Sequence, residues 1–216
     1  MTRLLVVGAS QGIGRAVCEA AVARGFAVRG MSRSGLLPAP LAGHCEAVKG
    51  DACDAADVAR ALEGVDLVVQ ALGVPTSLGL LTEPVTLFST ATRVLLPLMQ
   101  SAGVRKLVCV TGFGAGDSRD SISLLQRFPF ELVLKRAYDD KSLQESMIEA
   151  SDLDWLIVRP GILVNCATTA SYRVLTQPQE WRNGFVARAD VADFIVNRIA
   201  ANRFAREKPV IIRVPV

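Results

Sequence analysis

The sequence predicts an α/β fold: a doubly wound, mainly parallel sheet with helices on both faces. Short apolar runs alternate with helical patterns along all 216 residues. Such alternation is typical of buried parallel strands joined by crossover helices. A glycine-rich segment also follows the first apolar run and opens the first helical pattern. No linker or change in composition separates two units, so we expect one domain over residues 1–216, with a small substrate lobe formed by C-terminal loops.

The first half of the chain begins with a continuous apolar strand pattern, Leu4–Val7, that ends at a glycine. Arg15–Arg24 then has apolar side chains at helical spacing, and Gly25 is a typical C-terminal stop. The same criteria predict strands at Phe26–Met31, Cys45–Val48 and Asp66–Gln70, a helix at Asp54–Leu62, and loops at Ser32–Gly43 and Gly73–Thr82.

The second half continues the alternation with longer helices. A helix is expected at Val85–Ala102, closed by Gly103, and a charged amphipathic helix at Phe130–Ala150. Asp190 is the expected N-cap of a last helix that ends at Ile199. The remaining elements are strands at Lys106–Val110, Trp155–Val158 and Val210–Val214, a polar loop at Gly112–Ser123 and a less regular region at Asn165–Phe185.

Composition excludes several classes of function. The formal net charge is only +3, which gives no basic footprint for a nucleic acid as the main partner. No apolar run approaches the roughly 18 residues of a membrane span, and no signal-peptide pattern is present. We therefore expect a cytoplasmic protein without membrane contacts. Five dispersed cysteines and a single histidine, His44, indicate free thiols and no bound metal.

The glycine-rich segment after the first strand predicts a dinucleotide site. Gly8, Gly12 and Gly14 fit, in that order, a sharp turn, a close approach of backbone to a pyrophosphate, and tight packing of helix on sheet. Free N–H groups at the helix start favour the anion. The other loop residues expected to contact the cofactor are Ser10, Gln11 and Ile13. The alternative is a tight turn without a ligand, and the complete strand–loop–helix context favours the dinucleotide.

The end of the second strand distinguishes between the two nicotinamide cofactors. Sites for NAD place an acidic side chain there, to accept from the ribose 2′-hydroxyl. The segment Gly30–Ser34 contains no acid. Arg33 instead offers a guanidinium to a 2′-phosphate, and Ser32 can donate a further hydrogen bond. We therefore expect NADP(H), with a solvated loop arginine as the alternative.

Two further strand ends are expected to meet the cofactor. Asp51, followed by Ala52, can accept from the adenine amine or can cap the next helix, and both alternatives stay open. The residues after the fourth strand are small enough to let the ribose and phosphates pass; they are Ala71, Leu72 and Gly73.

These motifs together resemble the short, atypical members of the short-chain dehydrogenase/reductase superfamily, in particular the NAD(P)H-binding group of biliverdin reductase B-like flavin reductases and small epimerase-like oxidoreductases. The matching segments span nearly the whole chain: Val7–Gly14, Val28–Arg33, Lys49–Asp51, Ala71–Gly73, Val110–Asp117, Asp154–Gly161 and Arg188–Ala192. The resemblance implies a Rossmann-type sheet with NADP(H) across the carboxyl ends of its strands. It also implies hydride transfer from the nicotinamide to a bound acceptor.

The resemblance further implies roles at the nicotinamide end. Thr111 stands where the superfamily places a catalytic serine or threonine. The backbone expected to meet the nicotinamide carboxamide is that of Pro160, Gly161 and Ile162. The superfamily's Tyr-x-x-x-Lys pair corresponds to Tyr138 and Lys141, which are one residue closer together and so rotate the tyrosine by about 100° around the helix. Lys141 is the expected ribose or phosphate contact, and Tyr138 is either catalytic or an ordinary packing residue.

The acceptor is expected beneath two loops, Pro75–Glu83 and Asn165–Phe185, since ligands lie outside the carboxyl ends of the strands. The apolar residues of these loops include Leu78, Leu80, Leu81, Tyr172 and Trp181. They indicate a cleft for a flat acceptor, with ordinary packing as the alternative. The resemblance implies a conjugated acceptor such as a quinone or flavin.

The predicted function is therefore an NADPH-dependent oxidoreductase that acts on a small conjugated molecule. A non-catalytic NADP(H)-binding sensor is the alternative, and a sugar-nucleotide epimerase is less favoured. The chain is expected to be a monomer or a homodimer that pairs through Val85–Ala102 and Phe130–Ala150.

Overall fold

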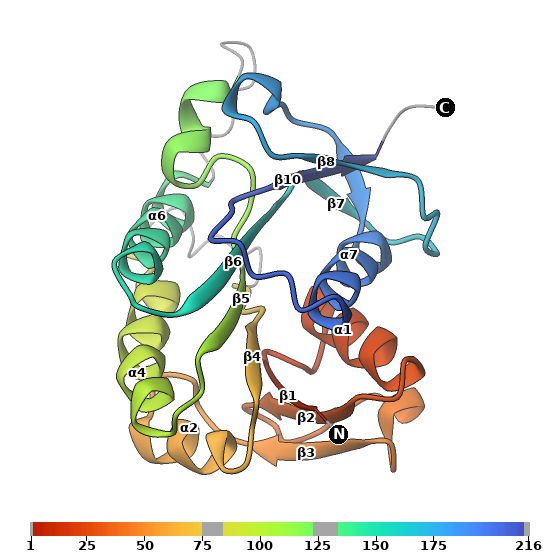
Figure 1. Cartoon of the computed structure of the whole chain (residues 1–216), viewed down its shortest axis with the longest axis vertical. Coiled ribbons are helices and arrows are strands. Elements are labelled where there is room, and N and C mark those ends of the chain that lie inside the picture. Colours follow the sequence, from red (N-terminus) through yellow and green to blue (C-terminus); the bar gives the residue numbers. More distant parts are fainter. Residues whose placement is uncertain (1, 75–83, 123–133, 214–216) are drawn as a thin grey trace.

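The computed structural model describes residues 2–74, 84–122 and 134–213 (Figure 1). Its centre is an eight-stranded sheet in the order β3-β2-β1-β4-β5-β6-β10-β8. Neighbouring strands pair in parallel, except that β8 runs antiparallel to β10. The mainly parallel, doubly wound sheet of the Rossmann type is thereby confirmed.

The element bounds follow the apolar runs of the sequence closely. The strands of the main sheet are β1 (Arg3–Val7), β2 (Ala27–Ser32), β3 (Cys45–Lys49), β4 (Leu67–Gln70), β5 (Lys106–Val110), β6 (Asp154–Pro160), β8 (Tyr172–Leu175) and β10 (Val210–Arg213). A separate pair comprises β7 (Ile162–Val164) and β9 (Phe185–Ala187). The helices are α1 (Gly12–Ala23), α2 (Ala55–Leu62), α4 (Leu87–Ser101), α6 (Lys135–Glu149) and α7 (Arg188–Ala200), and short 3₁₀ helices lie at Ala39–Leu41, Gly116–Ser121 and Pro178–Glu180.

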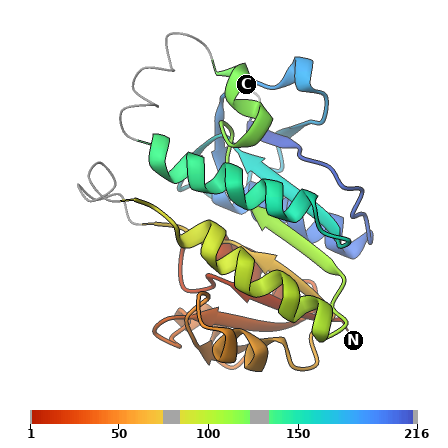
Figure 2. The same cartoon turned by 90° about the vertical axis from the view of Figure 1, so that its left-hand side faces the viewer.

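Two apolar cores lie on opposite faces of the sheet. Helices α1 and α7 cover one face, and α2, α4 and α6 cover the other (Figures 1 and 2). Successive residues of β1 alternate between the cores: Leu4 and Val6 face α1 and α7, whereas Leu5 and Val7 face the other three helices. A strand buried on both faces needs a continuous apolar run, which is why β1 is so easily predicted. None of the helices in the described ranges is long and apolar enough to cross a membrane.

The strand order places a switch point beside β1. From β1 the chain moves outward to β2 and β3, and then returns to the other side of β1 with β4. The connections after β1 and β4 therefore leave the sheet in opposite directions, and a crevice forms between them.

Most predicted bounds differ from the structure by one to three residues, and two segments differ more clearly. The charged helix begins at Lys135, because Leu134 lies before it with φ −110°; residues 130–133 lie outside the described ranges. The predicted irregular region contains β8, a four-residue strand at the sheet edge with two exposed side chains, too short and too exposed to give an apolar run. The predicted end of the last strand, Val214, lies outside the described residues.

The predicted N-cap at Asp190 is wrong. Helix α7 begins at Arg188, with Ala187 at the N-cap position. Asp190 lies in the first turn, where its buried carboxylate instead accepts hydrogen bonds from the loop before β8. Those partners lie about twenty residues earlier, so local spacing gives no indication of them.

Candidate functional site

A cleft of about 1060 Å³ opens at the carboxyl ends of the strands around the switch point. The glycine loop and the start of α1 form one wall, and the ends of β2, β4 and β5 form the floor. Most of the predicted cofactor residues line it: Gly8, Ser10, Gln11, Gly12, Ile13, Ser32, Arg33, Asp51, Ala52, Ala71, Leu72, Gly73, Thr111 and Lys141. The predicted residues that do not line it are Gly14, Tyr138, Pro160, Gly161 and Ile162.

Two positions of the loop require glycine for different physical reasons. A Cβ at Gly14 would lie 2.1 Å from the carbonyl oxygen of Gly8, so any larger residue would push α1 away from β1. Gly12 has φ +62°, and a Cβ there would meet no atom within 4 Å. Gly12 therefore leaves the cleft wall open for close approach of a ligand, whereas Gly14 serves packing.

The start of α1 is equipped to bind an anion. Its N-cap residue, Gln11, is extended, and no side chain caps the helix. The first-turn N–H groups of an α-helix have no partner within the helix and carry the positive end of its dipole. Because Gln11, Gly12 and Ile13 line the cleft, these donors suit a pyrophosphate.

Arg33 is an exposed cation at the end of β2. It lines the cleft and forms no ion pair with any residue of the described ranges. Arg15, on the opposite wall, is already paired with Glu19 at 2.8 Å. Ser32 also lines the cleft, and its hydroxyl lies 3.4 Å from that of Ser34. The unpaired guanidinium is the group best placed to meet a phosphate.

The structure decides one of the two alternatives for Asp51. Asp54 caps α2, since its carboxylate accepts from the Asp57 N–H at 2.9 Å. Asp51 accepts from the Cys53 N–H at 2.9 Å and is exposed at the cleft. Helix capping is therefore not the role of Asp51, and contact with an adenine amine stays a prediction.

Lys141 projects from α6 into the cleft floor. Its Nζ donates to the backbone carbonyl of Thr111 at 2.6 Å. The ammonium also lies 5.0 Å from the ring centroid of Phe88 and 5.1 Å from that of Tyr138. Burial lowers the pKa of Lys141 to about 8, against the attraction of Cys109 and Glu145. A lysine held this way is charged at neutral pH but is close to its titration midpoint.

Tyr138 lies beside the cleft, with its ring on Gly112. A Cβ at Gly112 would lie 2.6 Å from the tyrosine hydroxyl. Burial raises the pKa of Tyr138 to about 12. This position agrees with the rotation expected from the shorter Tyr–Lys spacing, and a catalytic role for Tyr138 stays a prediction.

Thr111 presents its hydroxyl to a buried carboxylate. Its Oγ1 donates to Glu145 Oε1 at 2.6 Å, and the side chain is almost fully buried. Because a hydroxyl has one proton, Thr111 can only accept hydrogen bonds from the cleft in this arrangement.

The backbone at Pro160–Ile162 is already paired within the sheets. The Pro160 carbonyl accepts from the Phe113 N–H at 2.9 Å, the Gly161 N–H donates to Ile211 at 3.0 Å, and the Ile162 N–H donates to Gly184 at 2.7 Å. These residues position the start of β7, and their predicted contact with a carboxamide stays a prediction.

Comparison with known proteins identifies the family. A family model described as NAD(P)H-binding matches residues 8–202. The chain belongs to this NAD(P)H-binding family. Family membership agrees with the cleft, since an uncapped helix N-terminus and an open glycine wall fit a nicotinamide dinucleotide.

Solved structures of similar fold include reductases. ChuY, an anaerobillin reductase from Escherichia coli O157:H7, is 28% identical with a TM-score of 0.82, and the match covers 100% of this chain and 98% of ChuY. ChuY from E. coli CFT073 is 29% identical with a TM-score of 0.81, over 100% and 99%. A short-chain dehydrogenase/reductase from Veillonella parvula, in complex with NADP, shares the fold at 13% identity and a TM-score of 0.80, over 98% and 94%. Together with the family, they support an atypical, NAD(P)H-dependent oxidoreductase.

The sequence did not predict individual site residues on one rim of this cleft, although Asn165 and Cys166 lie in the loop predicted to cover the acceptor. The rim is lined by Leu163, Asn165, Cys166, Arg188 and Ala189. Arg188 donates to the side-chain oxygen of Asn165 at 2.7 Å, which joins α7 to the segment after β7. Arg188 and Ala189 lie in a segment that contributes to the family resemblance. Strand β7 has only three residues, too few for a sequence pattern that would predict where Leu163 and Asn165 lie.

The two predicted acceptor residues that the structure describes, Tyr172 and Trp181, do not line the cleft. Trp181 is buried in a separate apolar cluster, and its indole N–H donates to the Leu175 carbonyl at 3.1 Å. Tyr172 packs edge-on against Phe194 and donates to Asp193 at 3.0 Å. For these two the packing alternative holds, while Leu78, Leu80 and Leu81 lie outside the described residues.

Proposed function

We propose that this protein is an NADPH-dependent reductase that transfers a hydride from the nicotinamide to a small conjugated acceptor, such as a quinone or flavin. The observation that carries the proposal is one continuous cleft. It brings together the uncapped start of α1, the unpaired Arg33 and the ammonium of Lys141. The first two groups complement the negative charges of the pyrophosphate and the 2′-phosphate of NADPH. The Lys141 ammonium is a hydrogen-bond donor suited to the hydroxyls of a ribose.

Each group would make a different contribution to binding. The α1 amides receive the pyrophosphate, and Arg33 with Ser32 receives the 2′-phosphate, which NADH lacks. Lys141 donates to ribose hydroxyls while Thr111 keeps its ammonium in place. The cofactor, when bound, supplies the hydride. Since the Thr111 hydroxyl donates to Glu145 and Tyr138 lies outside the cleft, the proton that follows the hydride comes from water.

The reductase activity draws support from ChuY, a reductase that this chain matches over nearly the full length of both proteins. The acceptor class rests on the family resemblance. A non-catalytic NADP(H) sensor would need the same phosphate contacts, so binding alone does not separate the two functions. Turnover does.

The test is oxidation of NADPH by the purified protein, followed by the loss of nicotinamide absorbance, with flavins, quinones, linear tetrapyrroles and small aldehydes as acceptors. We expect turnover with at least one conjugated acceptor. Tyr138→Phe keeps that activity, because Tyr138 lies outside the cleft. Tight NADPH binding without turnover of any acceptor would favour the sensor, and loss of activity in Tyr138→Phe would contradict the water-derived proton.

A further inference from the structure

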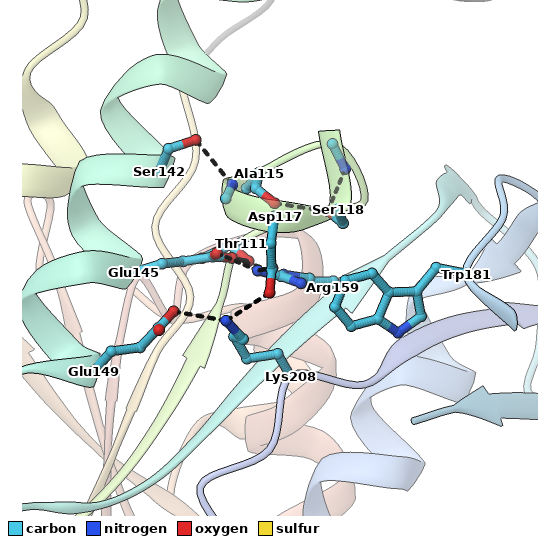
Figure 3. Close-up of polar contacts among 12 residues, drawn as sticks. Thr111, Ala115, Asp117, Ser118, Ser142, Glu145, Glu149, Arg159, Trp181 and Lys208 are labelled. Atoms are coloured by element: carbon cyan, nitrogen blue, oxygen red, sulfur yellow. Dashed lines mark hydrogen bonds and ion pairs between the residues drawn. The ribbon is translucent and has the colours of Figure 1, made fainter. Parts of the chain in front are cut away.

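A buried ion pair between α6 and β6 contacts Thr111, a residue that lines the cleft (Figure 3). Glu145 on α6 and Arg159 on β6 are 1% and 0% exposed. Arg159 donates through Nη2 to Oε2 at 2.6 Å and through Nε to Oε1 at 3.1 Å. A two-point contact of this kind fixes the plane of the carboxylate as well as its position.

The pair continues outward through charged residues to the surface. Arg159 also contacts Asp117 at 2.5 Å, and Lys208 bridges Asp117 and Glu149 at 2.9 and 3.0 Å. The ring of Trp181 lies 5.0 Å from the guanidinium carbon. Burial acts to lower the pKa of Arg159, but Glu145 and Asp117 outweigh it and raise the pKa, so the guanidinium stays charged.

Two side chains of α6 each form a hydrogen bond with Thr111. Glu145 accepts from the Thr111 hydroxyl at 2.6 Å. Lys141, one helical turn earlier, donates to the Thr111 carbonyl at 2.6 Å. The carboxylate that orients Thr111 is therefore tied to the lysine that faces the cleft, both through Thr111 and through their shared helix.

Stability alone gives little reason for such a pair. Replacing a buried ion pair by apolar residues of similar volume is often neutral or stabilising, because both charges are removed from water. The geometry of the Glu145–Arg159 pair is better suited to holding Thr111 in place at the cleft floor.

We propose that Glu145 is a positioning residue for the cofactor-facing lysine. Held by Arg159, Glu145 fixes Thr111 and thereby the carbonyl that binds Lys141 Nζ, and its negative charge favours the ammonium form of that lysine. The role of Lys141 toward a cofactor rests on the proposed function, whereas the coupling of Glu145 to Lys141 does not.

The groups that face Lys141 come from three elements. Glu145 and Tyr138 lie on α6, Cys109 lies on β5, and the uncharged ring of Phe88 lies on α4. Asp140, the next residue to Lys141, is turned to α4, where it accepts from the Phe88 and Ser89 N–H groups at 2.8 and 3.3 Å. Glu145 is thus the acidic side chain whose charge acts on this lysine.

The experiment is the titration of Lys141 in the cofactor-free protein, read from the side-chain carbon resonance next to Nζ and assigned with Lys141→Arg. Glu145→Gln keeps the size of the side chain and removes its charge. The double variant Glu145→Gln/Arg159→Met removes both charges, so no buried charge is left unpaired. Glu149→Gln is the matched control, one turn further along α6 and paired with Lys208 near the surface.

We expect the Lys141 midpoint near pH 8 in the wild type and about one unit lower in Glu145→Gln. The double variant also removes the positive charge of Arg159, so its midpoint falls by a smaller amount. Glu149→Gln leaves it unchanged. Equal midpoints in wild type and both Glu145 variants, or an equal shift in Glu149→Gln, would overturn the inference. NADPH titration of the same proteins tests the proposed function separately. A wild type that binds no NADPH while the midpoint shifts as expected would remove the cofactor role and leave the positioning role.

Discussion

At the scale of single residues, the proposed preference for NADPH over NADH depends on Arg33. Its guanidinium is exposed at the cleft and unpaired among the described residues. Arg33→Ala is expected to weaken NADPH binding about tenfold to hundredfold, because hydrogen bonds to a charged group contribute roughly 1.5–3 kcal/mol. NADH affinity changes less than about threefold, because NADH has no 2′-phosphate. Calorimetric titration of both cofactors measures the difference.

The control for Arg33 is Arg173→Ala, since Arg173 is exposed on β8 and does not line the cleft. It should leave both affinities unchanged. Equal losses for NADPH and NADH in Arg33→Ala would remove Arg33 from the 2′-phosphate site.

The proposed contact of Lys141 with the cofactor predicts that NADPH affinity depends on pH. Burial lowers the pKa of Lys141 to about 8, so its ammonium is present below that pH and is lost above it. An anionic cofactor prefers the charged form, so NADPH affinity falls about tenfold as the pH rises from about 7 to about 9.5. Lys141→Met binds weakly and shows no such dependence over this range. A wild-type affinity that stays constant across the range would contradict the role of Lys141.

At the scale of elements, Asp190 fastens the loop before β8 to α7. Its carboxylate accepts from Thr168 Oγ1 at 2.9 Å, from the N–H and Oγ1 of Thr169 at 2.7 and 2.8 Å, and from the Ala170 N–H at 3.1 Å. Ala170 has φ +49°, which is uncommon for a residue with a side chain. The loop therefore depends on these bonds rather than on its own conformational preference.

Asp190→Asn is expected to lower the free energy of unfolding by about 1–2 kcal/mol, since it removes the charge from these hydrogen bonds. Burial acts to raise the pKa of Asp190, but the bonds from Thr169, Thr168 and Ala170 outweigh it and lower the pKa. The stabilisation is therefore present above the unfolded pKa of about 3.9 and is lost as the pH falls through the lower folded value. Urea unfolding at several pH values measures it.

The exposed Asp152→Asn serves as the control for Asp190. It should not change the free energy of unfolding at any pH in the series. A difference between wild type and Asp190→Asn that persists unchanged in strong acid would contradict the carboxylate's role.

The regular elements were predictable where burial imposes a pattern. A strand such as β1 has its side chains in two cores and so needs a continuous apolar run. By contrast, β7 has three residues and β8 has four, with exposed side chains. Such strands form because they pair with a neighbouring strand, and no local sequence pattern indicates that pairing.

The candidate site was predictable only where its chemistry is local. The glycine loop and Arg33 follow strand ends, so their convergence at one sheet edge follows from the topology. The Glu145–Arg159 pair joins two elements, and the Asn165–Arg188 contact spans 23 residues. Contacts of this kind depend on how the helices pack on the sheet, and the spacing of residues in the sequence does not predict them.

At the scale of the whole molecule, the topology of the sheet brings motifs that lie far apart in the sequence together around one cleft. The return of the chain beside β1 opens the crevice, and α1, α6 and α7 each contribute residues to it. Helices α4 and α6 lie side by side on the outer face (Figure 2). Their use in a homodimer, a single domain over the whole chain and a cytoplasmic location stay predictions.

The most direct test of the account is a calorimetric titration of the purified protein with NADPH and, separately, with NADH at neutral pH. One NADPH is expected per chain with a dissociation constant in the micromolar range or below, and NADH is expected to bind at least about tenfold more weakly, as the loss of a charge-assisted 2′-phosphate contact requires. The absence of binding by either cofactor would contradict the central claim that this cleft holds a nicotinamide dinucleotide.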